Sequence, residues 1–507
     1  MWSTALPEEN EYIKDVYGHI AKGSLVNFIS QVGFSLSAML TSIIVARLLG
    51  PEEYGIFSIL SSLQSLIILL ASLNISVAVT KFLSEYRVTD FEKSVRYFNI
   101  AGLMTISASV IVCILLFVLS GFITVLYRYT ISPFLIRVTI VPVLISPLIL
   151  FLYSVFRGYQ KIKLHAYLQI ITSITRLSIL VSLTLLFGLI GLLIGIILEA
   201  ALFLVIQVIS LRRTIPTLFS FRLSFKFLKR DEILSIFKFT IPIFIPLVAI
   251  TFANWFTSTL LALNKGYTEI AFFAIAFTLS QIITYVPRAL SIPLLPSISE
   301  VATTSSDKVN LISNKAVTFV TNLGFLIALL LSVFPFYIVE ILYGSIYANT
   351  ITYMILIIGS IGFFLQSTIT PTIDVLFATG KTKAYCIISL VNVSFLIIFS
   401  FFLIPIAGGI GLSLSYLLST IVYVVLIRSY FLKLKQKIVW YPIQMTVLLF
   451  FLSFFVFWIF STFGLLITSI SAAFIFASAF IVIFFKLKKT GVLGLFLSLF
   501  SKKNSNK

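Results

Sequence analysis

Residues 177–209 read LSILVSLTLLFGLIGLLIGIILEAALFLVIQVI, a run whose single charged side chain is Glu199. A helix needs about 20 apolar residues to cross the hydrocarbon core of a bilayer, so this run is too long for one span. Gly188 and Gly191 interrupt it near its middle, where a tight turn would let the chain reverse direction. The run therefore predicts two antiparallel membrane-spanning helices.

The rest of the chain has the same character. Of its 507 residues, 60% are apolar and only 10% are charged, against about 25% in soluble proteins, and the mean hydropathy is +1.13. No polar stretch is long enough to form a soluble domain. The composition predicts an all-α integral membrane protein that crosses the bilayer many times.

Windows of about 20 apolar residues predict about 14 transmembrane helices. We expect them near 24–48, 54–80, 97–126, 132–156, 166–187, 189–211, 239–263, 268–297, 315–342, 349–378, 384–404, 407–427, 442–462 and 464–486. Of the 36 Lys and Arg residues, 30 lie in one alternate set of connections and 4 in the opposite set. Because basic loops stay inside, we expect a plasma membrane protein with both termini in the cytoplasm.

The sequence also predicts an internal repeat. The stretch EYGIFSI at 53–59 resembles EIAFFAI at 269–275, and GLIGL at 188–192 resembles GGIGL at 408–412. An even number of spans per repeat gives two pseudo-symmetric six-helix lobes in the same orientation, followed by two C-terminal helices. The expected segments are 1–23 (cytoplasmic), 24–211 (first lobe), 212–238 (basic linker), 239–427 (second lobe), 428–486 (helices 13 and 14) and 487–507 (basic tail).

The stretch ARLLGPEEYGIF at 46–57 resembles the start of the polysaccharide-biosynthesis flippases, the Wzx-like branch of the multidrug/oligosaccharidyl-lipid/polysaccharide exporter superfamily. Weaker matches are KFLSE at 81–85, RGYQK at 157–161, PLLPSISE at 293–300 and ATGKTK at 378–383. The resemblance implies a MATE-like fold with a central cavity that opens alternately to either face. It also implies transport of a polyprenyl-type lipid that carries a sugar chain through a phosphate or diphosphate, with helices 13 and 14 forming a groove for the lipid tail.

Four charged residues lie inside predicted spans, where charge is costly and usually faces a cavity or a partner: Arg176, Glu199, Arg288 and Asp374. Arg176 and Glu199 lie at similar depth on adjacent helices, so they either pair with each other or serve the substrate. In the functional interpretation Arg176, Arg288 and Lys81 bind the phosphate, since guanidinium groups give bidentate, permanently charged contacts. Prolines on both sides of Arg288 predict a bent eighth span around it.

Asp374 is a candidate coupling site for ions or protons. The structural alternatives are that it caps backbone groups freed by Pro371 or that it forms an ion pair with Lys381 or Lys383. Polar residues at mid-membrane either line the sugar path or make interhelical hydrogen bonds: Asn27, Gln31, Asn254 and Gln281. For Arg47 we expect a local ion pair with Glu52 or Glu53.

Other chemistry has little support in the sequence. His19, His165, Cys113 and Cys386 are too few and too scattered for a metal site, and we expect no cofactor. The net charge of +19 lies mostly in short loops, which indicates anionic membrane lipids rather than nucleic acid as partners. No arrangement of catalytic side chains lies outside the spans, so we expect no enzyme.

The favoured function is a flippase for lipid-linked oligosaccharides, with the lipid-linked sugar as substrate and glycan polymerase or transferase machinery as a further partner. The first alternative is a multidrug or cation antiporter of the same superfamily, which usually needs acids deep in the first lobe, where only Glu199 lies. The second is a membrane-embedded glycosyltransferase or polymerase, which generally needs a larger extramembrane loop than this sequence offers.

Overall fold

The computed structural model describes residues 7–220, 230–285, 306–434, 441–463 and 465–489, together with single residues between 287 and 298. Every regular element in these ranges is a helix. In chain order they are α1 (Pro7–Ser72), α2 (Ile75–Thr89), α3 (Phe91–Leu126), α4 (Pro133–Gly158), α5 (Ile162–Thr214), α6 (Thr217–Ser220), α7 (Arg230–Lys265), α8 (Tyr267–Ser280), η2 (Gln281–Thr284), α10 (Ser306–Val333), α11 (Pro335–Tyr343), η3 (Ser345–Tyr347), α12 (Thr350–Ala378), α13 (Thr382–Lys433), α14 (Tyr441–Phe463) and α15 (Leu465–Lys489).

Within the described ranges, nine helices are long and apolar enough to cross a membrane. Three long helices, α1, α5 and α13, each contain one glycine with non-helical backbone angles: Gly50, Gly188 and Gly408. These are the positions at which the sequence predicts a turn between two spans, so each long helix is a helical hairpin. The all-helical membrane architecture is confirmed, while the count of fourteen spans stays a prediction.

The predicted spans at 54–80 and 315–342 are each divided in the structure. The expected span at 54–80 is broken at Leu73 and Asn74, which both adopt left-handed backbone angles between α1 and α2. The expected span at 315–342 is divided between α10 and α11, because Pro335 starts a new helix. The predicted linker 212–238 is partly helical in the structure, since α5 continues to Thr214 and α7 begins at Arg230. Residues 221–229 of this linker lie outside the described part.

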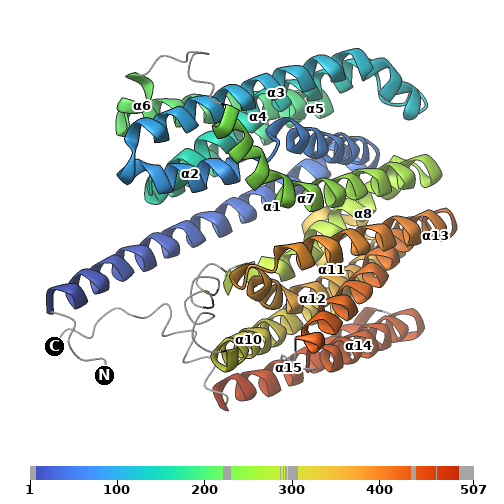
Figure 1. The fold of residues 1–507 in the computed structure, drawn as a ribbon. Helices are drawn as coiled ribbons and strands as arrows, with labels where there is room; N and C mark the ends of the chain where they lie inside the picture. The colour runs from blue at the N-terminus through green and yellow to red at the C-terminus, as the bar shows by residue number, and fades with distance from the viewer. Residues whose placement is uncertain are drawn as a thin grey trace.

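The helices form two groups that lie side by side (Figure 1). In the first group α5 packs against α1 and α4, and α3 packs against α4. In the second group α12 packs against α10 and α13, and α14 packs against α10 and α15. Helices α1, α7 and α8 lie between the groups, where α1 contacts both α7 and α8.

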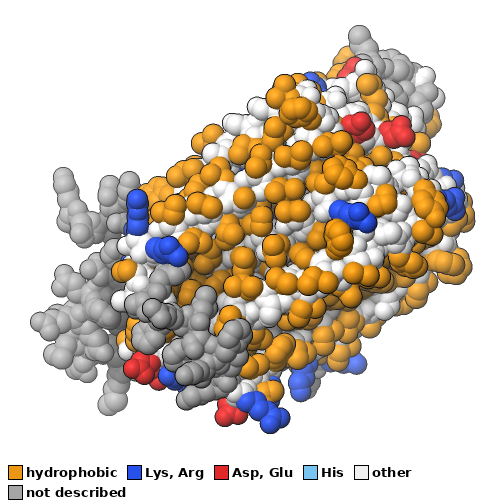
Figure 2. Space-filling model, turned by 90° about the horizontal axis from the view of Figure 1, so that it is seen from above, with side chains coloured by type: hydrophobic (Ala, Val, Ile, Leu, Met, Phe, Trp, Pro, Cys, Tyr) orange, Lys and Arg blue, Asp and Glu red, His pale blue; other side chains and the backbone are white. Residues whose placement is uncertain are grey.

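The outer surface of the molecule is apolar. Figure 2 shows hydrophobic side chains over most of the visible described face, with the few charged side chains mainly toward its margins. Helix α3 contributes a broad exposed set: Val110, Ile111, Ile114, Leu115, Phe117, Val118 and Phe122. Such a surface is unstable in water and stable in lipid, which agrees with the expectation from composition.

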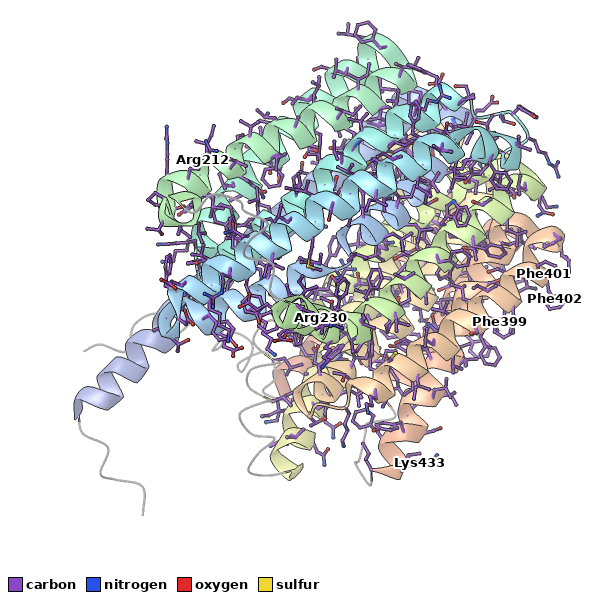
Figure 3. All side chains as sticks on the ribbon, turned by 45° about the horizontal axis from the view of Figure 1, so that its top comes forward. Arg212, Arg230, Phe399, Phe401, Phe402 and Lys433 are labelled. Carbon is purple, nitrogen blue, oxygen red and sulfur yellow. The ribbon has the colours of Figure 1, made fainter. Side chains whose placement is uncertain are left out.

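Contacts of Arg47, Glu53, Gly55 and Glu269 bring five turns with positive φ at glycine to one end of the molecule, called here the glycine-turn end: Gly50, Gly188, Gly266, Gly344 and Gly408. Gly380, which also has positive φ, precedes the first half of α13 and so lies at the opposite end from Gly408. Helix α13 runs between the two ends of the molecule. In Figure 3 its residues Phe399, Phe401 and Phe402 lie near the glycine-turn end, and Lys433 lies at the other end. Arg212 and Arg230 also lie away from these phenylalanines. We call the end with Arg212, Arg230 and Lys433 the basic end.

The predicted repeat has a structural counterpart at the glycine-turn end. The backbone N–H of Gly409 donates to Oε2 of Glu269 over 3.2 Å, so the carboxylate of Glu269 closes the turn at Gly408. In the first group Oε2 of Glu53 lies 3.6 Å from the place that a Cβ on Gly188 would occupy. Each repeat therefore brings the acid that starts one helix against the glycine turn of a helical hairpin.

Helix α7 connects the two groups. Its first part packs on the first group, where Nε of Arg96 donates to Oε1 of Glu232 over 3.1 Å. Its later part packs on α13, where Ala253 shares an apolar cluster with Val393 and Leu396. Pro242 and Pro246 lie between these two parts, at positions where a helix bends most easily.

We expect Arg96→Ala to lower the free energy of unfolding by about 1–3 kcal/mol, since it leaves the Glu232 carboxylate unpaired. The range allows for solvent at the pair, whose side chains are 22% and 9% exposed. Glu232→Gln should cost less, because a neutral amide oxygen can still accept from Arg96. Titration with a denaturing detergent measures both variants, and an Arg96→Ala protein as stable as the parent would contradict the expectation.

Candidate functional site

The first group of helices contains the Arg176 and Glu199 pair. Both residues lie on α5, on either side of the turn at Gly188, and both are partly buried. Glu199 interacts electrostatically with Arg176, yet their charged atoms do not come within the 4.0 Å of an ion pair; in the described part of the chain only Arg96 and Glu232 do. The structural alternative of a direct ion pair is therefore not formed here.

Arg176 retains unused capacity to donate hydrogen bonds. Its guanidinium carbon lies 5.6 Å from the centre of the Phe34 ring on α1, a cation–π distance. Its Nε is buried and has no hydrogen-bond partner among the described residues. A buried guanidinium donor without an acceptor is costly, so a ligand or water at this place would stabilise it.

The second group contains Arg288 and Asp374, which belong to the same region. Helix α8 gives way at Gln281 to the short 3-10 helix η2, a change in winding before the proline-rich segment that carries Arg288. Arg288 is exposed. Oγ of Ser291, one turn further on, donates to Oδ2 of Asp374 over 2.6 Å.

Asp374 is 8% exposed and follows Pro371 in α12. In the described part of the chain it makes no ion pair with Lys381 or Lys383, which corrects the ion-pair alternative that the sequence suggested. Its hydrogen bond to Ser291 instead ties α12 to the segment after α8. Sequence reasoning missed Ser291, since a serine 83 positions away carries no pairing signal.

Lys81 lies on α2 and is exposed. Its ammonium group lies 4.4 Å from the centre of the Phe239 ring on α7 and 5.2 Å from that of Phe82. Arg176 lies on α5, and Arg288 lies in the segment that follows η2. The three candidate phosphate ligands therefore lie on different elements of the fold.

The candidate polar lining is placed in part. Tyr416 on α13 donates a hydrogen bond to Oδ1 of Asn254 on α7, which is the interhelical alternative that the sequence left open. Gln281 is partly buried at the start of η2. The side chains of Asn27 and Gln31 lie outside the described residues.

Arg47 joins the two groups at the glycine-turn end. Its Nε donates to the carbonyl of Leu342 over 2.8 Å, and Nη2 donates to the carbonyl of Ile341, both at the end of α11. The expected local ion pair with Glu52 or Glu53 is therefore wrong, because the open carbonyls of a helix end bind the guanidinium instead. Tyr347 Oη adds a bond to the carbonyl of Ala46 over 2.8 Å.

A second contact between the groups lies beside it. Nε1 of Trp255 donates to Oη of Tyr127 over 3.1 Å, and that hydroxyl also lies 3.1 Å from Oγ1 of Thr259. A Cβ on Gly55 would lie 1.9 Å from the carbonyl oxygen of Tyr267, so the two groups approach closely there. The groups are thus fastened together at the glycine-turn end.

These features define the class of the protein. It is a polytopic α-helical membrane protein with two groups of helices and unpaired charge at mid-depth, as in membrane transporters. Residues 20–301 match the family of polysaccharide biosynthesis proteins. The match spans more than half of the chain, and the chain belongs to this family. No match was found among curated proteins.

Solved structures of transporters have a similar fold. The lipid II flippase MurJ in an inward closed conformation aligns with a TM-score of 0.72 and 15% identity, over 91% of this chain and 99% of MurJ. A multidrug resistance MATE family transporter of the MOP superfamily gives 0.64 and 15%, over 82% and 99%. The Vibrio cholerae MATE transporter VcmN in the bent form gives 0.54 and 16%, over 81% and 98%. These likenesses confirm the predicted MATE-like fold.

Proposed function

We propose that the protein is a flippase that carries a lipid-linked oligosaccharide from the cytoplasmic to the outer leaflet for polysaccharide or glycan biosynthesis. Membership of the polysaccharide biosynthesis family, on a fold shared with a lipid II flippase, is the observation that carries this proposal. The substrate is a polyprenyl or dolichyl phosphate or diphosphate that bears sugars. The chain has no catalytic role in this proposal and only moves its substrate.

The phosphate is the part of the substrate that the protein holds. Arg176 supplies a buried donor without a partner, and Arg288 supplies an exposed guanidinium beside a bent helix. Lys81 supplies a third positive charge near the basic end. Contacts spread over three helices favour entry of an anion while leaving each step weak enough for release.

Alternating access follows from the two groups of helices. With the glycine-turn end fastened by Arg47, the substrate enters from the basic end, which in this proposal faces the cytoplasm at the plasma membrane, the side on which the basic loops place both termini. Loss of the Arg47 contacts and closure of the basic end then expose the sugar on the other side. Anionic lipids gather at the basic end, and glycan polymerase or transferase machinery receives the product outside.

Asp374 and Glu199 are the candidates for coupling this movement to ions or protons. Asp374 links α12 to the segment that carries Arg288 through Ser291, so a change in its charge would act on that segment. Glu199 lies near Arg176 and would act on the first group.

Reconstitution in vesicles tests the function. A fluorescent polyprenyl-diphosphate oligosaccharide should become accessible to an impermeant quencher only in vesicles that contain the protein. Vesicles with heat-denatured protein control for leakage. The fold is also that of MATE multidrug transporters, so export of a cationic dye together with no exchange of any lipid-linked sugar would replace the flippase with a cation antiporter.

A further inference from the structure

A polar stripe follows one face of the first half of α5. Its members recur at helical spacing, on successive turns from the basic end to mid-depth: His165, Gln169, Thr172, Ser173 and Arg176. The opposite face of the same helix is exposed and mainly apolar: Tyr167, Ile170, Ile171 and Ile174. The stripe therefore faces the interior of the first group, while the apolar face meets lipid.

Several polar atoms of this stripe have no partner among the described residues. They are Nδ1 of His165, Oε1 of Gln169 and Nε of Arg176, and all three atoms are buried. The side chain of His165 is only 3% exposed. On the returning half of α5, Gln207 is 0% exposed and neither Oε1 nor Nε2 has a partner. Gln207 and Gln169 are equally far along the chain from the turn at Gly188, so they lie at about the same depth.

Unpaired polar atoms in a membrane interior are costly, since lipid offers no hydrogen bonds. A single such atom has little significance, but a row of them along one helix face matches what ordered water requires, namely two or more polar partners for each molecule. Thr172 and Ser173 add hydroxyl groups to the row, although both already donate to carbonyls of their own helix.

The two ends of the stripe have different surroundings. At the basic end the His165 ring lies 3.9 Å from the ring of Tyr153, and the guanidinium of Arg157 lies 5.6 Å from the same tyrosine. At mid-depth Oγ of Ser37 on α1 donates to the carbonyl of Ser173 over 2.7 Å. The stripe ends at Arg176, which faces Phe34 and interacts with Glu199.

We propose that this face of α5 holds a file of water molecules that connects the basic end with the Arg176 and Glu199 pair. A proton taken from water at the basic end moves along this file, past His165, and binds to the carboxylate of Glu199. Arg176 is the charged group that faces Glu199, and Arg157 is the one near His165.

The water file has a consequence for the substrate, which rests on the proposed function. Ionised Glu199 weakens the positive field of Arg176, while neutral Glu199 leaves it unopposed. An anion at Arg176 should therefore bind more tightly when Glu199 is protonated, that is, as the pH on the basic side falls.

Cysteine accessibility tests the water file without any transported lipid. In a background that carries Cys113→Ser and Cys386→Ser, single cysteines replace Gln169, Thr172 or Ser173 on the stripe, and Ile174 on the lipid face as a matched control. Ile174 is 64% exposed in the structure, so lipid rather than protein would shield it. A small water-borne methanethiosulfonate reacts only with a hydrated thiol, and we expect it to label the stripe positions at least about tenfold faster.

Equal or slower labelling at all folded stripe variants would overturn the water file, whether or not the protein flips lipids. Three stripe positions keep the test decisive if one variant fails to fold, which size-exclusion chromatography detects.

Binding of a polyprenyl diphosphate to the solubilised protein tests the role of Glu199. We expect the parent protein to bind more tightly at acidic than at neutral pH. The Glu199→Gln variant has no titrating group at this position, so its pH dependence reports titration of the ligand itself. The change in the parent should be larger than the change in this variant. An identical pH dependence in both proteins would overturn the role of Glu199. Failure of lipid exchange in vesicles with normal labelling would instead remove the flippase and leave the water file.

Discussion

Gly408→Ala is expected to lower the free energy of unfolding by about 2–4 kcal/mol. Gly408 has φ 56° and ψ −129°, a backbone conformation that side chains with a Cβ rarely adopt. An ideal Cβ there would lie 2.2 Å from Oε2 of Glu269. The carboxylate could move aside, but it would then lose its bond from the Gly409 N–H.

Gly188→Ala provides the matched control, because Gly188 has nearly the same backbone conformation at the equivalent turn. The nearest atom to its ideal Cβ is Oε2 of Glu53 at 3.6 Å, an ordinary contact. Only backbone strain remains, so we expect a smaller loss of about 1–2 kcal/mol.

A double-mutant cycle separates strain from the lost hydrogen bond. Glu269→Ala removes both the collision and the acceptor, so Gly408→Ala combined with Glu269→Ala should cost clearly less than the sum of the two single changes. Titration with a denaturing detergent measures each protein. Additive losses would mean that Glu269 does not close this turn.

The glycine turns also illustrate what the sequence could predict. Apolar runs and turn glycines are local properties, so the hairpins at Gly188 and Gly408 were predictable from residues beside them. The repeat was predictable as well, since Glu53 and Glu269 begin similar stretches. What the sequence could not give was the contact itself, in which each acid reaches a turn well over 100 positions later.

Helix breaks without glycine or proline were not predictable either. Leu73 and Asn74 interrupt an apolar run, and the break is supported by a bond from the Asn74 N–H to Oγ of Ser72 over 3.3 Å. Asparagine tolerates left-handed angles, but it does so too rarely to mark a break by itself.

Partners of charged side chains were predicted least well. Glu52 and Glu53 lie beside Arg47 in the sequence, yet its acceptors are carbonyls about 295 positions later. Asp374 likewise accepts a hydrogen bond from Ser291 and forms no ion pair with the two lysines nearby in the sequence, Lys381 and Lys383. In both cases the observed contact is made with a residue distant in the sequence and not with a nearby opposite charge. Such partners depend on how whole helices pack, which local sequence does not show.

Arg176→Ala should reduce the rate of lipid-linked oligosaccharide exchange in reconstituted vesicles by about tenfold or more, since a charge-assisted hydrogen bond to a phosphate contributes about 1.5–3 kcal/mol. Arg176→Lys should retain part of the activity, because it keeps the charge but loses the planar fork. We expect Arg176→Ala to raise the lipid concentration at which exchange is half-maximal, because a ligand contact is lost, and not only to lower the maximal rate.

Arg137→Ala is the matched control for removing an arginine from this membrane protein. Arg137 is exposed on α4, where Nε donates to Oγ of Ser120 over 3.2 Å and the guanidinium lies 4.9 Å from the Phe117 ring. Its loss should leave exchange within about twofold of the parent, because surface contacts of this kind contribute little.

The Arg288→Ala variant decides between the two halves of the candidate site. If Arg176→Ala folds normally and exchanges lipid at the parental rate while Arg288→Ala fails, the phosphate is held by the second group, and the unpaired Nε of Arg176 belongs to hydration alone. If both variants fail, the phosphate meets both groups during transport. That result would fit a substrate that passes between two arginines on different elements of the fold, Arg176 on α5 and Arg288 after η2.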